Sequence, residues 1–501
     1  MAGERGTVGH EKVNVYYFSV KHAEAITYAQ AQIDRLQNLG LGAYDLAQKD
    51  IHEVGRKTAL VQVPSPTIDK PATIEWNESG SRRPWNLIFG EEHDNTSDID
   101  VSVRGEADQC EGVLLVHKLG ESTTNVVESH VLWRTVPDSL GVSTPNSKEE
   151  EVSNSVRLTG DYWLLSGNAA GKAVVEFKTA GTSVITPTSA AFVERDDWPD
   201  GESVVTTELS AAEEVGQTVL SVDDETDFKQ GQLIMIFKDA SNWEITRVVS
   251  TDTGEITIQD ALDNAYAIDD EVKTTRGVTV FVHNSTDQTE GDCGWMVEGD
   301  DYRVVCTAGV TTIVNVDAGT AIGASDVCVI SYLLASAAEE WTDNDADLTH
   351  VRDPQTKLVV SPNSDFSSSQ ELRRGQGYDI AVTFSREVSY ESGSSIPIRR
   401  ALNSVEARLT FPGYESDLTT FARLAAKDPD TVKTMRPEQS PEVHVRQEIY
   451  KDANRYPGDI RLCYELPKSK KTGGENAQSS NEQGTKRITV TSTNMIIAGE
   501  L

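Results

Sequence analysis

The chain has 501 residues, 38% of them hydrophobic and 25% charged, which is enough for about three folded domains with separate cores. Its 80 Asp and Glu residues against 45 Lys and Arg give a formal net charge of −35, which argues against a protein that holds nucleic-acid phosphates with basic side chains. The five cysteines show no CxxC spacing, which argues against a disulfide framework or a zinc site.

At the N-terminus, residues 1–13 lack the apolar stretch of a secretory signal, and no run of about 18 apolar residues occurs further along. We therefore expect a protein that is made and kept in the cytoplasm and has no membrane segment. A helix with weak periodicity is expected over residues 22–36.

The dominant pattern along the chain is short alternation of apolar and polar residues between Gly, Asp, Asn, Ser and Pro. This pattern predicts a mainly β protein built of sandwiches or barrels. Segments of this kind are 113–117, 174–177, 233–237, 256–258, 278–282 and 488–490. The clearest helix is expected over 416–427, where Ser416 can cap the first turn and the apolar residues share one face.

Two small β regions are expected in the middle of the chain. Residues 206–276 form the first, with a turn before the apolar strand 233–237. Residues 277–340 hold further short strands. The stretch 336–353, rich in Ala, Glu and Asp, is interpreted as a linker.

Two stretches with the same order of features suggest an internal repeat. Each begins with a strand-like run that ends in Glu-x-Gly, at residues 53–55 and 391–393. A polar loop, an alternating strand and a helix-like stretch follow, at 72–76 and 84–89 in the first and at 404–411 and 416–427 in the second. We expect two copies of one β domain, each with a short helix, over 1–205 and 345–501. Chance similarity between β-rich segments is the alternative.

Three segments of the second copy, 378–393, 403–411 and 416–426, resemble the major tail proteins of long-tailed, siphovirus-like viruses. Proteins of that family have a strand that ends near Glu-x-Gly, a long loop, a strand with Thr and Glu, and a helix that opens with Ser-Asp. Residues 149–161, which end in Gly-Asp, resemble their late strand. The likeness is one of pattern, without an invariant motif.

The resemblance implies a tail-tube fold, a β-sandwich or barrel with one flanking helix, whose copies join their inner sheets and stack as rings around a channel for DNA. With two such domains in one chain, it implies a homotrimer with pseudo-sixfold symmetry, with a homohexamer as second choice. It also implies a place in the virion tail, tape-measure and tail-terminator or baseplate proteins as partners, and DNA that passes without specific binding. The small β modules would be decoration. Loops after the Glu-x-Gly sequences would contact neighbouring rings or subunits, at positions Glu53, Gly55, Arg56, Glu391, Gly393 and Arg399.

The net charge adds an expectation about the surroundings of the protein. Carboxylates spread over the chain repel one another in dilute buffer, and about 1 M salt screens this repulsion by shortening the Debye length to about 3 Å. We therefore expect a protein of a molar-salt cytoplasm, such as that of a haloarchaeal host, with an ordinary acidic protein as the alternative. In a tube, a carboxylate-rich lumen would repel DNA phosphates at contact.

No motif for catalysis or cofactor binding stands out. Residues 343–347 begin like a calcium loop, but Leu348 and Pro354 occupy the positions that need Gly and Glu. The acidic run 223–227 is typical of β-turns, and the tryptophans are typical of core packing. We expect no catalytic residues, no cofactor and no metal ion.

Three other functions stay open beside the tail-tube subunit. One is a baseplate or capsid-decorating protein built from similar β domains. Another is a carbohydrate-binding surface adhesin, and the third is a polysaccharide-active enzyme of β architecture.

Overall fold

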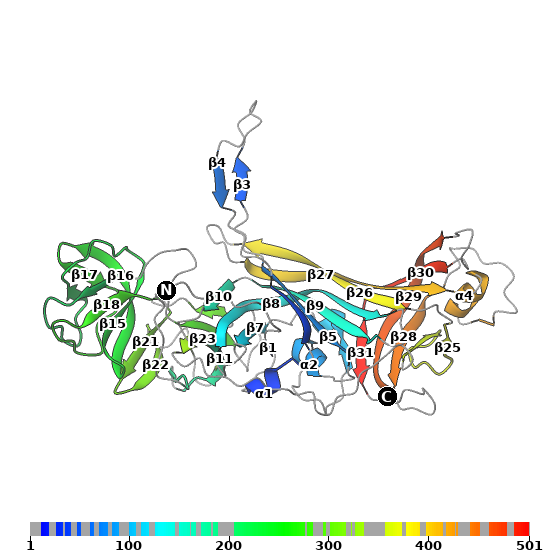
Figure 1. The fold of residues 1–501 in the computed structure, drawn as a ribbon, viewed down its shortest axis with the longest axis horizontal. Helices are drawn as coiled ribbons and strands as arrows, with labels where there is room; N and C mark the ends of the chain where they lie inside the picture. Colours follow the sequence, from blue (N-terminus) through cyan, green and yellow to red (C-terminus); the bar gives the residue numbers. More distant parts are fainter. Residues whose placement is uncertain are drawn as a thin grey trace.

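A computed structural model gives the fold of the chain (Figure 1). Within the residues that the structure describes, the chain is mainly β, with several antiparallel sheets and few short helices, so the predicted fold class is confirmed. The described residues are 12–19, 27–33, 36–41, 48–51, 61–64, 70–78, 83–89, 100–106, 112–119, 126–145, 150–160, 162–166, 172–181, 184–188, 205–275, 278–283, 294–296, 301–316, 322, 326–334, 356–372, 377–390, 397–413, 417–425, 427–428, 441–450, 460–477 and 485–499.

Residues 12–166, the first unit, pair their strands in one antiparallel series. Its elements are β1 (Lys12–Ser19), α1 (Tyr28–Ala31), β2 (Leu36–Leu41), β3 (Gln48–Ile51), β4 (Val61–Pro64), β5 (Lys70–Asn77), α2 (Arg83–Phe89), β6 (Asp100–Ser102), α3 (Val103–Glu106), β7 (Gly112–Leu119), β8 (Val126–Thr144), β9 (Ser153–Gly160) and β10 (Tyr162–Ser166). β1 pairs with β7, β7 with β8, β8 with both β9 and β10, β9 with β5, and β5 with β2. β3 and β4 form a separate hairpin.

Residues 356–499 form the second unit. Its elements are β24 (Thr356–Ser361), β25 (Gln370–Glu371), β26 (Tyr378–Tyr390), β27 (Pro397–Gly413), α4 (Asp417–Leu424), β28 (Val443–Tyr450), β29 (Ile460–Ala477), β30 (Thr485–Ser492) and β31 (Ile496–Gly499). β24 pairs with β28, β28 with β29, β29 with both β30 and β31, β30 with β27, and β27 with β26. β25 adds to β24, and β6 of the first unit adds to β31.

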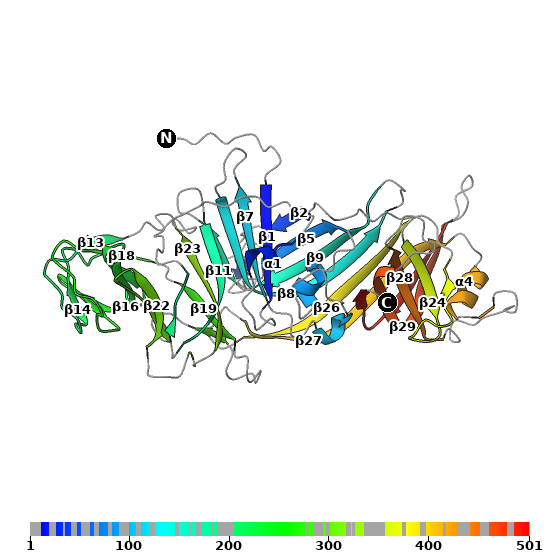
Figure 2. The same cartoon turned by 90° about the horizontal axis from the view of Figure 1, so that it is seen from below.

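The two units share one sheet, because β8 of the first pairs with β26 of the second. Eight strands follow one another across this joint in the order β2-β5-β9-β8-β26-β27-β30-β29; we call them the central sheet. Figure 2 shows β8, β9, β26 and β27 side by side in the middle of the molecule. Alternating apolar residues form these strands, since period-two alternation places one side of each strand in a core.

One hydrophobic core lies under the central sheet and runs through both units. It includes Ile74 and Val156 of the first unit and Val382, Leu409 and Val490 of the second, all buried. α2 contributes Trp85 and Phe89 to the same core. The two units therefore share their interior as well as their sheet.

The insert, residues 172–334, forms two further sheets between the units in sequence. Its strands are β11 (Lys172–Thr179), β12 (Val184–Ile185), β13 (Thr206–Glu208), β14 (Val219–Ser221), β15 (Leu233–Asp239), β16 (Asn242–Asp252), β17 (Glu255–Ile258), β18 (Glu271–Thr274), β19 (Thr279–His283), β20 (Gly294–Met296), β21 (Tyr302–Thr307), β22 (Val310–Asn315) and β23 (Val327–Leu334). One sheet has the order β11-β23-β19-β20, and the other joins β12, β22, β21, β16, β15, β18 and β13, with β17 and β14 attached to β16. Figure 1 places the insert at one end of an elongated molecule.

Several expectations about single elements can be compared with the structure. α2 and α4 occupy the stretches expected at 84–89 and 416–427. The helix expected over 22–36 is wrong at its end, because α1 is one turn long and Leu36 already begins β2. The linker expected at 336–353 lies outside the described residues. Two strands expected in the first domain, β11 and β12, pair with β23 and β22 of the insert.

Candidate functional site

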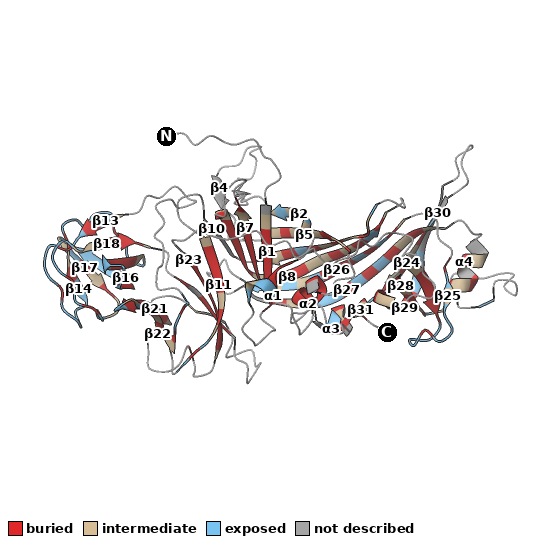
Figure 3. Cartoon of the chain, turned by 60° about the horizontal axis from the view of Figure 1, so that its bottom comes forward, coloured by how far each residue is buried: buried red, intermediate tan, exposed pale blue. Residues whose placement is uncertain are grey.

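Hydroxyl side chains line the face of the central sheet that points away from the core. The positions on this face are exposed or half-buried, while most of their neighbours along each strand are buried (Figure 3). Ser and Thr are the commonest residues there: Thr73, Ser139, Ser143, Ser153, Ser155, Thr159, Thr383, Ser385, Ser404, Thr410, Thr489 and Thr491. We call this surface the hydroxyl face.

Charges on the hydroxyl face are few and nearly balanced. Its described strand positions carry the carboxylates of Glu75, Asp138, Asp379, Glu387 and Glu406 and the basic groups of Arg157, Arg408, Lys470 and Arg487. Arg157 Nε lies 3.3 Å from Asp138 Oδ2, and Arg408 Nη2 lies 2.9 Å from Glu406 Oε1. Exposed pairs of this kind contribute about 0–1 kcal/mol, so they serve to neutralise charge more than to stabilise the fold. The face thus differs from the chain as a whole, whose net charge is −35.

The joint between the two units lies in the middle of this face. Tyr378 to Thr383 of β26 pair with Thr144 to Ser139 of β8, and the hydroxyl of Ser143 donates a 2.7 Å hydrogen bond to Asp379 Oδ1. A shallow depression of about 290 Å³ lies at the joint, where Gly141 and small serines leave room between the strands. The joint is therefore a regular antiparallel pairing between strands far apart in sequence.

Beneath the joint, a buried polar network connects the units. Trp85 Nε1 donates a 3.0 Å hydrogen bond to the Tyr464 hydroxyl, which donates a 2.5 Å bond to Glu78 Oε2. Asn154 Nδ2 donates to the same carboxylate oxygen at 2.7 Å. Complete burial, together with the neighbouring Glu78 carboxylate, raises the pKa of Tyr464 well above its usual value. Tyr464 belongs to β29 and the other three residues to the first unit, so this network fixes one unit against the other.

Both ends of the central sheet have an open edge within the described part of the chain. β2 pairs there with β5 on one side only. The last residues of β29, Gly473–Ala477, pair there with β30 on one side only. Open edges present backbone N–H and C=O groups that can pair with another strand.

Most of the predicted contact loops lie outside the described residues. Glu53, Gly55, Arg56, Glu391 and Gly393 all fall there, so their prediction stays untested. Arg399 belongs to β27, where it pairs with Ser389 of β26. The strands that flank 52–60, β3 and β4, stand away from the rest of the molecule in Figure 1.

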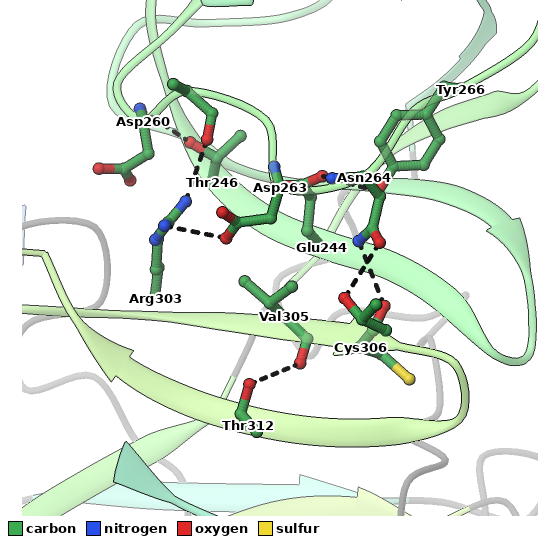
Figure 4. A network of polar contacts seen from close by, with 12 residues as sticks. Glu244, Thr246, Asp260, Asp263, Asn264, Tyr266, Arg303, Val305, Cys306 and Thr312 are labelled. Carbon is green, nitrogen blue, oxygen red and sulfur yellow. Dashed lines mark hydrogen bonds and ion pairs between the residues drawn. The ribbon is translucent and has the colours of Figure 1, made fainter. Parts of the chain in front are cut away.

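The insert holds a second buried polar network, drawn in Figure 4. Glu244 accepts hydrogen bonds from the backbone N–H groups of Asp263 and Asn264, at 3.1 and 3.2 Å, and from the Tyr266 hydroxyl, at 2.9 Å. Burial raises the pKa of Glu244 in spite of these donors. Asn264 Nδ2 also donates to the carbonyl of Cys306 at 3.2 Å. The network fastens the 259–266 connection to β16 and β21.

Groups suited to chemistry are few in the part of the chain that the structure describes. No three His, Cys, Asp or Glu side chains there are placed to share a metal ion, and no helix there is long and apolar enough to cross a membrane. Cys306, Cys328 and Cys463 are free and buried, and burial raises the pKa of the Cys328 and Cys463 thiols to about 12. Such thiols are poor nucleophiles near neutral pH.

Sequence reasoning did not single out the residues that make this surface. The hydroxyl face, the joint and the two open edges depend on which strands pair across long stretches of chain. A usable signal was present in runs such as 487–492, where Ile488 and Val490 alternate with Thr489 and Thr491. Such a run predicts a strand with one polar face, but not the neighbours of that strand.

Comparisons with known proteins add little. A scan against protein-family models found no match, and a search of curated proteins found none either. Among solved structures, the sheath–tube complex of an extracellular contractile injection system, PVC, in its extended state is 9% identical over 33% of this chain and 94% of that chain, with a TM-score of 0.23. The tube-terminating cap of the anti-feeding prophage is 12% identical over 33% of this chain and 95% of that chain, with a TM-score of 0.22. At these values the likeness does not by itself assign a fold or a function.

Proposed function

We propose that the chain is a non-enzymatic structural subunit of a viral tail tube, whose copies join their central sheets into rings around a channel for DNA. One observation carries this proposal. The central sheet has a core on one side, a polar face on the other, and an open edge at each end of the described strands. Closing such sheets into a ring removes edges that otherwise invite uncontrolled pairing.

The hydroxyl face suits the inner wall of such a channel. Basic side chains would hold DNA by releasing its counterions, whereas this face pairs two of its three described arginines with carboxylates. Ser and Thr hydroxyls offer neutral contacts that water can replace. The proposal therefore replaces the carboxylate-rich lumen expected from the sequence with a neutral, hydroxyl-lined one.

The resemblance to tail-tube proteins implies six domains in each ring. Three chains with two units each would supply them with pseudo-sixfold symmetry; six chains per ring is the second choice. Rings stack into a tube in the virion tail, where tape-measure and tail-terminator or baseplate proteins are the partners. The insert lies on the outside as decoration, and the contacts with neighbouring rings or subunits are made at Glu53, Gly55, Arg56, Glu391, Gly393 and Arg399.

Electron microscopy of the purified chain tests the proposal at about 1 M and about 0.1 M salt, since only the former screens the surface charge. We expect stacked rings with a central channel at high salt, and fewer at low salt. Monomers or compact oligomers without a channel at about 1 M salt would count against a tube subunit.

An adhesin or a baseplate component is the rival reading, and the insert is the region that would carry it. Binding of the monomeric chain to a glycan array, without ring formation, would support the adhesin. Single rings that never stack would support a baseplate or decoration protein. Release of reducing sugar from a polysaccharide would refute the proposed lack of enzymatic activity.

A further inference from the structure

The pairing order of the first unit recurs in the second, strand for strand. β1, β7, β8, β10, β9, β5 and β2 pair with one another as β24, β28, β29, β31, β30, β27 and β26 do, and every pairing is antiparallel. A short helix also follows the equivalent strand in each unit: α2 comes after β5, and α4 comes after β27. The two units thus have one topology.

An irregularity in the backbone repeats at the same point of this topology. The register of the β7–β8 pairing shifts between Leu132 and Thr135 of β8, and Arg134, which lies between them, has φ 48°. The register of the β28–β29 pairing shifts between Leu466 and Ser469 of β29, and Lys468, which lies between them, also has φ 48°. A positive φ is uncommon outside glycine, so this shared bulge aligns the two strands residue by residue.

A second bulge supports the same alignment. The β8–β9 pairing shifts between Pro137 and Ser139, and the β29–β30 pairing shifts between Lys471 and Gly473. Each shift lies at the same separation from the positive-φ residue before it. Bulges are specific structural features and rarely coincide by chance, so Ser139 of β8 corresponds to Gly473 of β29.

The joint between the units can then be carried over to the open edges. The central sheet consists of two equivalent four-stranded parts, β2-β5-β9-β8 and β26-β27-β30-β29. Within the chain, the last strand of the first part, β8, pairs with the first strand of the second, β26. The last strand of the second part is β29 and the first strand of the first part is β2, and these are the two open edges of the described sheet.

We propose that β29 of one chain pairs antiparallel with β2 of a second copy of this chain, as β8 pairs with β26 within one chain. The proposal rests on the proposed function and names the strands that meet. Around a ring, joints within chains alternate with joints between chains, so every ring contains an even number of units.

The register of the joint between chains follows from the same correspondence. From Ser139 the ladder of paired residues runs across β9 and β5 to Gly40, and from Gly473 it runs across β30 and β27 to Asp379. Gly40 is therefore equivalent to Asp379. Since Asp379 pairs with Ser143, we expect Gly40 to pair with Ala477 of a second copy, the residue equivalent to Ser143.

Disulfide trapping tests this register in the assembled full-length chain. Gly40→Cys is tolerated sterically, because an added Cβ would lie 3.6 Å from Thr73 Cβ, an ordinary contact. We expect the double variant Gly40→Cys/Ala477→Cys to give covalently linked chains on non-reducing gels, with the linkage mapped between positions 40 and 477. Each single variant should run as the monomer, which controls for the native cysteines.

A matched control uses the joint within the chain. The double variant Asp379→Cys/Ser143→Cys should close a disulfide inside one chain, since these side chains already touch at 2.7 Å. Gly40→Cys/Asn476→Cys moves one position out of register and should link at least about tenfold less, because neighbouring residues of a strand point to opposite faces.

Hydrogen exchange of the unmodified chain provides a test that needs no variant. Ring formation should slow amide exchange at least about tenfold in residues 36–41 and 473–477, because new strand pairing protects their amides. The exchange of β25 should stay unchanged. Rings that form without this protection and without the 40–477 linkage would overturn the proposed joint while leaving the tube subunit intact. Absence of rings under all conditions would overturn both.

Discussion

The central sheet and the insert are built from similar strands, but they differ in charge and in closure. Residues 205–275 of the insert carry 16 Asp and Glu against 4 Lys and Arg, whereas the hydroxyl face is nearly balanced. All the large hydrophobic side chains found exposed in the described residues also belong to the insert: Val215, Val219, Val249, Ile268 and Val310.

Closure differs in the same way. Within the insert, the residues between Val205 and Val272 have a core of their own, whereas β11, β19 and β23 share a core with β1, β7 and β8 of the first unit. The two units instead share one core and one sheet across their joint, and that sheet ends in open edges within the described residues. Residues 205–275 therefore carry a net charge of −12 out of the −35 of the whole chain, whereas the face proposed to line the channel carries nearly balanced charges.

The largest effect on the free energy of unfolding is expected from Trp85→Ala, which tests whether the two units are stabilised together and independently of the insert. Trp85 is fully buried beneath the joint and contacts Trp76 and Tyr464, so its loss should cost about 3–5 kcal/mol of unfolding free energy. Urea unfolding followed by regional hydrogen exchange should show both units destabilised together. Trp243→Ala is the matched control, because Trp243 is buried in the insert and its loss should leave the units unchanged.

A smaller effect is expected from Tyr464→Phe. The change removes the hydroxyl between Trp85 and Glu78 and keeps the ring, leaving a buried donor and a buried carboxylate with fewer partners. We expect a loss of about 1–3 kcal/mol, measured by urea unfolding. Tyr450→Phe serves as a comparison, since the Tyr450 hydroxyl bonds Glu448 within one strand. Equal unfolding curves for wild type and Tyr464→Phe would show that the network does not hold the units together.

The two positive-φ residues give a paired prediction of smaller size. Arg134→Gly and Lys468→Gly should each relieve backbone strain of about 1 kcal/mol, since glycine adopts φ 48° freely. Both variants should raise the urea midpoint by similar amounts if the two bulges are equivalent. Opposite signs in the two variants would break the equivalence on which the joint between chains depends.

The smallest effect is expected from Glu244→Gln in the insert, and it concerns the dependence of stability on pH. The folded pKa of Glu244 is raised by burial, so its contribution to stability is complete below about pH 4.5 and is lost as pH rises through the folded pKa. Glu244→Gln carries no charge at any pH and should abolish that loss. Thermal unfolding of the insert against pH measures this, with Glu255→Gln, at an exposed position of β17, as control. An unchanged pH profile in Glu244→Gln would show that the burial of Glu244 does not govern it.

Local patterns in the sequence predicted what is local in the structure. The helix at α4 follows from Ser416 and an apolar face, and the strand at β30 follows from the alternation of Ile488 and Val490 with threonines. The expected helix over 22–36 failed because Leu36 and Leu39 pack against the core beside β5, so tertiary pairing overrode weak helical periodicity.

The joint and the edges were beyond such reasoning. Ser143 and Asp379 meet across more than two hundred residues, and nothing in either segment specifies the other as its partner. The paired Glu-x-Gly sequences that suggest the repeat lie outside the described residues. The stronger signs of repetition, the bulges at Arg134 and Lys468, are conformations of two basic residues that carry no local sequence signature.

A cryo-electron microscopy reconstruction of the assembled chain tests the account most directly. We expect neighbouring chains to share a continuous sheet in which β29 of one lies against β2 of the next, with the hydroxyl face lining a central channel. Chains whose sheets end at their own edges, or a channel lined by the insert, would contradict it.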